Sequence, residues 1–340
     1  MASAPSTPSC ANTYPIVVAG SGGSGTRLVV ALLRAAGVYM GTKVNATEDA
    51  VSFRLFNQRW LLGYLRHRLG RLGRLDSPPM AADLQRCIAA HKADLNNPSR
   101  PWGWKRPEFI FALPFLSEQL PTMTFLHVVR HPLDMALSSN QNDLKRYGAT
   151  ALGWRYGHEP LPLRSLRLWI LGNLSAVEFG EASLGPRYLR LHYEALCLRP
   201  TETIAALFNS LGLVAAPEAV APLVTNPGTL GRWRNETDSR LLFRLLEVGA
   251  PALKRLDYWD EATYRELRTR AGRMGRAWTI IADFAGRSSY LGNRVNPFPP
   301  AWAFFLRVVR AAREGRLRSA LRRRWVSWTS FRLNRRERLL

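Results

Sequence analysis

Short apolar runs separated by longer, helix-compatible stretches recur along this chain of 340 residues. A short apolar run bounded by turn residues is typical of a buried strand. The runs predict strands at 101–105, 124–130 and 187–192, and the stretches between them predict helices at 108–120, 132–146, 163–183 and 202–212. The region 45–100 is expected to be mixed helical. This alternation predicts an α/β fold with a central, doubly wound parallel sheet and helices on both of its faces.

The most informative apolar run lies near the start, where residues 15–37 predict a strand, a loop and a helix. Val17-Val18-Ala19 is followed by four glycines within six positions, and a helix-compatible run from 27 to 36 comes next. This order aims backbone N–H groups and the positive end of a helix dipole at a phosphate. The loop fails the Walker A pattern, because Thr26 replaces its Lys and Arg27 replaces its Ser or Thr. A phosphate site that does not hydrolyse ATP is therefore expected.

A second predicted strand ends in residues that can also bind an anionic group. The apolar run that ends at Arg130 is followed by His131-Pro132, which can start a helix. Arg130 would then lie at the carboxyl edge of the sheet, where open α/β sheets bind ligands. Ser138, one to two turns into that helix, can present its hydroxyl at the same place, and the pair suits a second anionic group of the same ligand. His127, inside the apolar run, is expected to be a hydrogen-bonded core histidine.

Five segments in the same order resemble the sulfotransferases that use 3′-phosphoadenosine 5′-phosphosulfate (PAPS). They are Ser24-Gly25-Thr26, the stretch 102–107 with Lys105, Arg130 with Ser138 eight residues later, Tyr193-Glu194 followed by Pro200, and the basic loop 231–234. The resemblance covers roughly residues 15–260. It implies a P-loop-like sulfotransferase fold, PAPS as the donor, 3′,5′-ADP as the product and no requirement for a metal.

The resemblance also implies which residues hold the donor. They are Gly22, Gly23, Ser24, Gly25, Thr26, Arg27, Arg130, Ser138, Tyr193, Arg232, Trp233 and Arg234. Arg232 and Arg234 would clamp the 3′-phosphate, and Tyr193 would line the nucleotide side of the cleft. Gly23 departs from the pattern, since many members carry Lys or Arg there. Arg27 or Lys105 would then supply the missing charge.

Two residues are expected to carry the chemistry. By the same resemblance, Lys105 would neutralise the bridging oxygen as the sulfuryl group leaves. Sulfuryl transfer to a hydroxyl benefits from a general base. Glu48 is the first candidate, because its loop after the first helix resembles the segment that carries a catalytic Glu in tyrosine- and carbohydrate-type sulfotransferases. Its other interpretation is a favourable charge at the start of the next helix. Glu108, just past Lys105, is the alternative base.

Much of the positive charge lies at the C-terminal end of the chain. Lys and Arg exceed Asp and Glu by 23, and residues 301–340 contribute twelve Arg against two Glu, a net +10. Beyond the proline-rich linker 296–300, two basic amphipathic segments (304–314 and 317–328) suit an anionic membrane surface, or a helical pair packed on the main domain. The chain is thus expected to comprise a flexible lead (1–14), a sulfotransferase domain (15–260) and a basic helical C-terminal extension (261–340).

The leading functional hypothesis is transfer of the sulfuryl group of PAPS to a hydroxyl, with eleven Trp and ten Tyr favouring a carbohydrate or glycolipid acceptor. Two alternatives stay open: a P-loop small-molecule kinase that uses ATP, and a non-catalytic basic membrane-binding protein with a degenerate sulfotransferase fold. No nucleic-acid motif is visible. The polar first fourteen residues and the lack of a membrane-length apolar run predict a cytoplasmic protein, in peripheral contact with the inner face of a membrane through 301–340.

Overall fold

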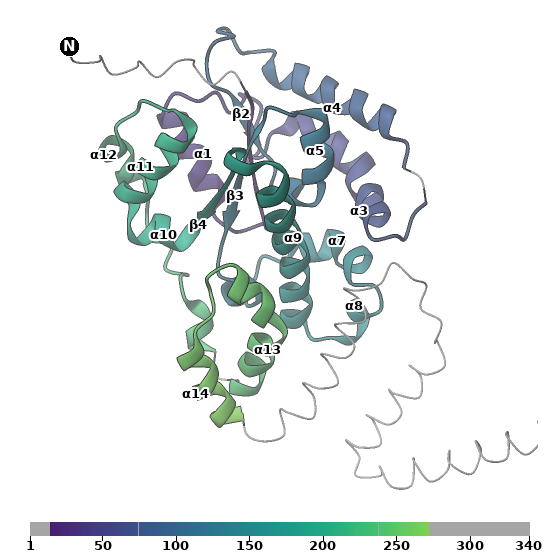
Figure 1. The fold of residues 1–340 in the computed structure, drawn as a ribbon, viewed down its shortest axis with the longest axis vertical. Coiled ribbons are helices and arrows are strands. Elements are labelled where there is room, and N and C mark those ends of the chain that lie inside the picture. The colour runs from purple at the N-terminus through teal and green to yellow at the C-terminus, as the bar shows by residue number, and fades with distance from the viewer. Residues whose placement is uncertain (1–13, 74, 237, 272–340) are drawn as a thin grey trace, which may run out of the picture. The chain divides into compact units, whose positions relative to one another are not determined.

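The computed structural model describes residues 14–73, 75–236 and 238–271, all of which belong to one compact unit (Figure 1). The predicted linker 296–300 and the two basic segments beyond it lie outside the described residues, as does the predicted lead except for Tyr14. The helices are α1 (Thr26–Ala35), α2 (Arg54–Phe56), α3 (Leu62–Arg68), α4 (Ser77–Lys92), α5 (Leu113–Gln119), α6 (Pro132–Ala136), α7 (Asn142–Leu152), α8 (Arg155–His158), α9 (Leu161–Ser183), α10 (Tyr193–Leu198), α11 (Pro200–Leu211), α12 (Pro217–Val220), α13 (Ser239–Arg255) and α14 (Glu261–Ala271).

The sheet has four parallel strands: β1 (Ile16–Gly20), β2 (Gly103–Lys105), β3 (Thr124–Val129) and β4 (Tyr188–His192). Their order is β2-β1-β3-β4, and Gly20 of β1 lies opposite Val128 of β3. The chain continues from β1 to β2 on one side, while β3 lies on the other side of β1. The switch point of the topology therefore falls between β1 and β3, where open α/β sheets bind ligands. The predicted strands and the parallel α/β fold are confirmed.

Helices cover both faces of the sheet because side chains alternate along buried strands. On one face Val18 and Leu126 pack with α1 and α11, which lie together at the left of Figure 1. On the other face Val17 and Phe125 belong to a larger core with α9 and the helices at the right of the view. The prediction of helices on both faces is confirmed.

The predicted domain boundary at 260 falls between two helices that pack together. The ring of Tyr264 on α14 stacks on Phe243 of α13. The division of the chain at 14 and 260 stays a prediction.

Two of the predicted helices are wrong in detail. The stretch 132–146 is divided into α6 and α7, because the side chains of Ser138 and Asn140 accept the N–H groups of residues 140 and 142 and turn the chain between the two helices. The stretch 108–120 begins as a 3₁₀ helix (Pro107–Ala112) and becomes α5 only at Leu113. Pro114 lacks the N–H that an unbroken helix needs, so the α-helical pattern restarts there.

His127 lies in the core of the sheet, as expected for a core histidine. Its side chain is buried, with Nδ1 2.7 Å from the hydroxyl of Tyr188 and Nε2 2.9 Å from Oδ1 of Asn173. Burial, only partly offset by the hydrogen bond to Asn173, lowers the pKa of His127 to about 4. The imidazole is therefore neutral in the folded protein at neutral pH.

The buried imidazole predicts a pH dependence of stability. Between pH 6.5 and 4 the unfolded chain binds a proton on His127 and the folded chain does not, so this group's effect is absent above pH 6.5 and lowers the free energy of unfolding by about 3 kcal/mol at pH 4. His127→Gln is expected to unfold more easily at pH 8 but to lose less stability on acidification. Urea unfolding from pH 8 to 4 checks this, with the exposed His158→Gln as control. Equal slopes for wild type and His127→Gln would contradict the assignment.

Candidate active site

The glycine loop, residues 21–25, joins β1 to α1 at the switch point. Gly23 and Gly25 have φ angles of 98° and 96°, in the left-handed region that favours glycine. A Cβ on Gly25 would lie 2.1 Å from a ring carbon of Tyr193, so no larger residue fits there. Ser24 is fully buried, and its hydroxyl has no hydrogen-bond partner within the described part of the chain. The loop thus combines a helix N-terminus with an unpartnered hydroxyl, as a phosphate group requires.

Arg130 extends from the end of β3 to the same place. Its side chain is buried and donates to Gly23 O (3.3 Å), Thr229 O (2.8 Å) and Thr229 Oγ1 (2.9 Å), and its guanidinium lies 5.1 Å from the ring centre of Tyr193. The Nε atom is buried without a partner. The structure therefore brings together three of the predicted donor-binding elements: the glycine loop, Arg130 and Tyr193.

The basic loop 231–234 is attached to the same strand end by Asp134, a residue of the segment from Arg130 to Ser138 to which the sequence analysis gave no role. Asp134 is fully buried, and its carboxylate accepts the N–H groups of Gly231 (2.8 Å) and Trp233 (3.1 Å). Trp233 stacks on His131, at 5.3 Å between ring centres and 16° between planes. Burial and the nearby Arg130 lower the pKa of Arg232. Two guanidinium groups that repel one another favour an anion between them.

Asp134→Ala is expected to lower the free energy of unfolding by about 3–5 kcal/mol, because two buried N–H groups lose their acceptor and the charge of Arg130, 4.0 Å away, loses its partner. Urea unfolding at pH 7 measures this loss. Glu202→Ala is the control, since this exposed residue forms an ion pair with the exposed Arg199 and its loss should change stability by less than about 0.5 kcal/mol. A loss below 1 kcal/mol for Asp134→Ala would show that the basic loop does not depend on this carboxylate.

The remaining predicted donor-binding residues lie around these groups. Ser138 follows α6, and its Oγ accepts the N–H of Asn140 (3.2 Å), so it is not inside a helix as expected. The guanidinium of Arg234 lies over the ring of Trp233, 4.5 Å from its centre. Thr26 is buried at the start of α1, and the side chain of Arg27 is exposed one residue later. Arg27 faces solvent here, and the guanidinium of Arg130 donates to the carbonyl oxygen of Gly23.

Lys105 ends β2 and is 3% exposed. Its Nζ donates to Thr47 O (2.6 Å) and forms an ion pair with Oδ1 of Asp49 (2.6 Å). Burial alone would raise the pKa of Asp49, but the hydrogen bond and charge of Lys105 outweigh it and lower the pKa. Asp49 was missed by the sequence analysis, although it is the neighbour of Glu48.

The two predicted bases are both engaged elsewhere. Glu48 has a left-handed φ of 64°, and its Oε2 lies 3.2 Å from Nη2 of Arg34, in the last turn of α1. Glu108 is buried, and its Oε1 lies 2.5 Å from Asn57 Nδ2, 2.5 Å from Arg106 Nη2 and 3.6 Å from Arg146 Nη1. Their catalytic roles stay predictions.

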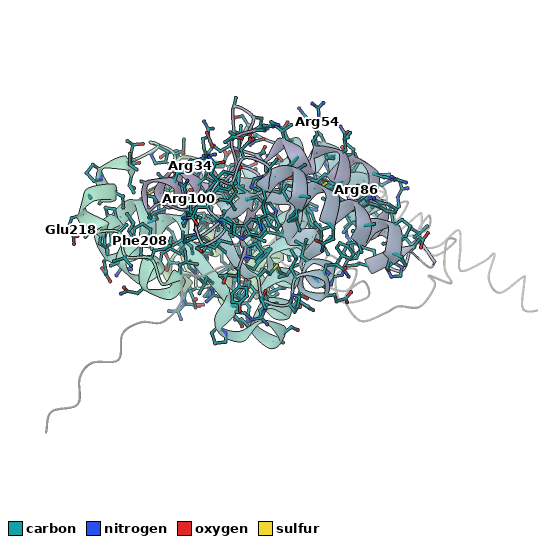
Figure 2. The ribbon with its side chains drawn as sticks, turned by 90° about the horizontal axis from the view of Figure 1, so that it is seen from above. Arg34, Arg54, Arg86, Arg100, Phe208 and Glu218 are labelled. Carbon is teal, nitrogen blue, oxygen red and sulfur yellow. The ribbon has the colours of Figure 1, made fainter. Side chains whose placement is uncertain are left out.

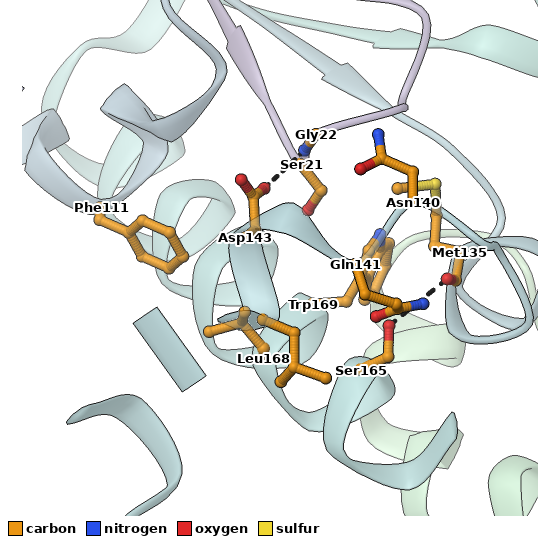
Figure 3. Close-up of a pocket in the computed structure, with 11 residues that line it drawn as sticks. Ser21, Gly22, Phe111, Met135, Asn140, Gln141, Asp143, Ser165, Leu168 and Trp169 are labelled. Atoms are coloured by element: carbon orange, nitrogen blue, oxygen red, sulfur yellow. Dashed lines mark hydrogen bonds between the residues drawn. The ribbon is translucent and has the colours of Figure 1, made fainter. Parts of the chain in front are cut away.

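One further carboxylate, also missed, touches the glycine loop. Asp143, in the first turn of α7, accepts the N–H of Gly22 at 2.7 Å through Oδ2 (Figure 3). The sequence placed Asp143 inside a single helix from 132 to 146, which hid the turn that directs it toward the loop. Only the tertiary structure, which brings α7 to the glycine loop, shows the contact.

A profile of the sulfotransferase family matches residues 15–217, more than half of the chain. The chain belongs to the sulfotransferase family. Several solved structures are similar at low identity: sulfotransferase STF9 from Mycobacterium avium (12% identity, TM-score 0.48, covering 73% of this chain and 78% of that one), the sulfotransferase domain of the olefin synthase from Synechococcus PCC 7002 (17%, 0.43, 68% and 90%) and a sulfotransferase from Alicyclobacillus acidocaldarius (15%, 0.43, 74% and 98%). No curated protein matches the chain.

The matched segment of this sulfotransferase ends at residue 217, before the basic loop. The loop and the preceding Thr229 are joined to the site by their contacts with Asp134 and Arg130. Within the described residues no group of three or more His, Cys, Asp or Glu side chains is placed to hold a metal ion. In the same part of the chain no helix is both long and apolar enough to cross a membrane. Exposed arginines occur on several elements, among them Arg54 and Arg86 on α2 and α4 (Figure 2).

Proposed function

We propose that this sulfotransferase transfers the sulfuryl group of PAPS to the hydroxyl of an acceptor and releases 3′,5′-ADP. The observation that carries the proposal is the meeting of two groups of anion-binding atoms at the switch point. The glycine loop, with the unpartnered hydroxyl of Ser24, follows β1, and the buried Arg130 follows the adjacent β3. PAPS has anionic groups at two ends, a 5′-phosphosulfate and a 3′-phosphate, which match this pair.

In this proposal the loop residues Gly23, Ser24, Gly25 and Thr26 bind the 5′-phosphosulfate through backbone N–H groups and hydroxyls, and Gly22, whose N–H is donated to Asp143, lies beside it. The 3′-phosphate binds Arg130, Ser138 and the basic loop with Arg232 and Arg234. The repulsion between Arg130 and Arg232 supports this assignment, since an anion between them relieves it. Tyr193 and Trp233 line the nucleotide side.

Lys105 is assigned to the leaving group. The bond between sulfur and the bridging oxygen breaks as the acceptor oxygen attacks, and negative charge develops on the 5′-phosphate. A cation fixed in a buried position stabilises that charge without reorganisation. Lys105 is buried at the end of the strand next to β1, and its present partner is the carboxylate of Asp49. Arg27 is exposed, which favours Lys105 as the charge that replaces the one missing at Gly23.

The acceptor is proposed to be a carbohydrate or glycolipid hydroxyl, and the protein to be cytoplasmic with residues 301–340 in contact with the inner face of a membrane. The net charge of +10 in that segment supports attraction to anionic lipid. Co-sedimentation of the full chain with anionic vesicles, and not with neutral ones, is expected. Equal recovery with both would remove the membrane contact from the proposal.

Ligand-induced changes in the melting temperature test the donor. A ligand that binds only the folded state raises Tm. We expect 3′,5′-ADP to raise Tm without magnesium and to do so at lower concentration than ATP. A larger rise with ATP and Mg²⁺ would favour the P-loop kinase, and no rise with either nucleotide would favour the non-catalytic membrane-binding alternative.

A further inference from the structure

Asp143 has no part in the proposed donor site, yet it lies against the glycine loop. Besides the hydrogen bond from Gly22, a Cβ on Gly22 would lie only 3.0 Å from the same carboxylate oxygen, which shows how closely the two approach. The bond joins the first turn of α7 to the loop that follows β1. The carboxylate is thereby fixed next to the atoms assigned to the 5′-phosphosulfate.

The carboxylate also lines a small pocket with a volume of about 30 Å³, close to that of one water molecule (Figure 3). Ser21 and Gly22 of the glycine loop form one wall, and Phe111, Leu168 and Trp169 contribute apolar side chains. Among the described residues that line it, Asp143 is the one acidic or basic side chain. A space of this size beside a carboxylate can hold a single hydroxyl group.

Three other carboxylates, those of Glu48, Glu108 and Asp49, form ion pairs with cations. Glu48 pairs with Arg34, which lies eight residues after Thr26 and thus about 12 Å along α1 from the loop. Glu108 contacts Arg106 and Arg146, and Asp49 contacts Lys105. Asp143 instead accepts its hydrogen bond from an uncharged amide.

We propose that Asp143 is the general base of sulfuryl transfer and that the pocket beside it receives the reactive hydroxyl of the acceptor. This inference rests on the proposed function. The proton of the acceptor hydroxyl passes to a carboxylate oxygen of Asp143 while the acceptor oxygen forms a bond to sulfur. The bond from sulfur to the bridging oxygen breaks, and its electron pair stays on the 5′-phosphate of 3′,5′-ADP. Protonated Asp143 then returns its proton to water.

The electrostatic surroundings suit a base. Burial raises the pKa of Asp143 to about 6, the charges of Glu108 and Asp49 act in the same direction, and the Gly22 amide and Arg146 oppose them. Tyr147 of α7 also faces the group and is protonated, since burial raises its pKa far above neutrality. The lining residues from α9 and from the turn before α7 are uncharged. A base whose pKa lies near the working pH is efficient.

The test compares Asp143→Asn with wild type. The amide oxygen of Asn can still accept the Gly22 N–H, so the variant removes the base and keeps the loop. Sulfuryl transfer is measured from ³⁵S-labelled PAPS to octyl glucoside and to water, and the affinity for 3′,5′-ADP by calorimetry. We expect about a 100-fold or greater loss of turnover with affinity within twofold. The wild-type rate is expected to rise with pH around a midpoint near 6, and this rise to be absent in the variant.

Three further variants, Glu118→Gln, Asp143→Ala and Glu48→Gln, serve as comparisons. Glu118→Gln, an exposed acid on α5, should keep turnover and affinity. The inference would be overturned if the turnover of Asp143→Asn were within threefold of wild type. It would also be overturned if Asp143→Asn lost as much affinity for 3′,5′-ADP as Asp143→Ala, because Asp143 would then only support the loop. A loss of turnover in Glu48→Gln but not in Asp143→Asn would assign the base to Glu48. If wild type itself does not bind 3′,5′-ADP, the proposed function fails, which is a separate and recognisable outcome.

Discussion

Replacing Arg130 with alanine is expected to weaken binding of 3′,5′-ADP by about 30- to 5000-fold, which corresponds to about 2–5 kcal/mol. The guanidinium is buried between the glycine loop and Thr229, where a charged contact is not screened by water. In the proposed function, removing it takes away a charged partner of the 3′-phosphate. Isothermal titration calorimetry with 3′,5′-ADP measures the effect.

The matched ligand for this experiment is 5′-AMP, which lacks the 3′-phosphate. If Arg130 binds that phosphate, Arg130→Ala should change the affinity for 5′-AMP by less than about threefold. Arg199→Ala, which removes an exposed arginine paired with an exposed glutamate, should leave both affinities unchanged. Equal losses for the two nucleotides would show that Arg130 supports the fold of the site rather than the 3′-phosphate.

Lys105→Met is expected to lower turnover by about 10²- to 10³-fold, the range seen when one group that stabilises developing charge is removed. The affinity for 3′,5′-ADP should change little, because the charge on the bridging oxygen develops only during transfer. Transfer from ³⁵S-labelled PAPS to octyl glucoside and to water measures turnover, and calorimetry measures affinity.

The single substitution also leaves Asp49 without its cation in a largely buried position. The double variant Lys105→Met/Asp49→Asn removes this uncompensated charge, and Asp49→Asn alone is the control that keeps Lys105. We expect the double variant to recover stability but not turnover. A double variant with wild-type turnover would refute the role of Lys105 in the transfer step.

Local pattern predicted the strands, because each buried strand is a short apolar run bounded by turn residues. The glycine spacing predicted the phosphate loop, because it determines where left-handed backbone and the start of a helix occur, as at Gly23 and Gly25. It failed at 132–146, since the competition between side-chain and helix hydrogen bonds at Ser138 and Asn140 depends on small differences in free energy. Because of that error, the sequence analysis did not place Asp143 near the site.

The sequence by itself determined the parallel α/β fold, the glycine loop and the positions of Arg130 and Lys105 at strand ends, because these follow from periodicity and from the rule that parallel strands end at one edge. Only the tertiary structure decided which carboxylates meet them. Asp134, Asp49 and Asp143 are separated in the chain from Trp233, Lys105 and Gly22 by 99, 56 and 121 positions. No local pattern encodes such pairs. They arise because strand order and helix packing bring distant loops to one edge of the sheet, where a buried polar group needs a partner.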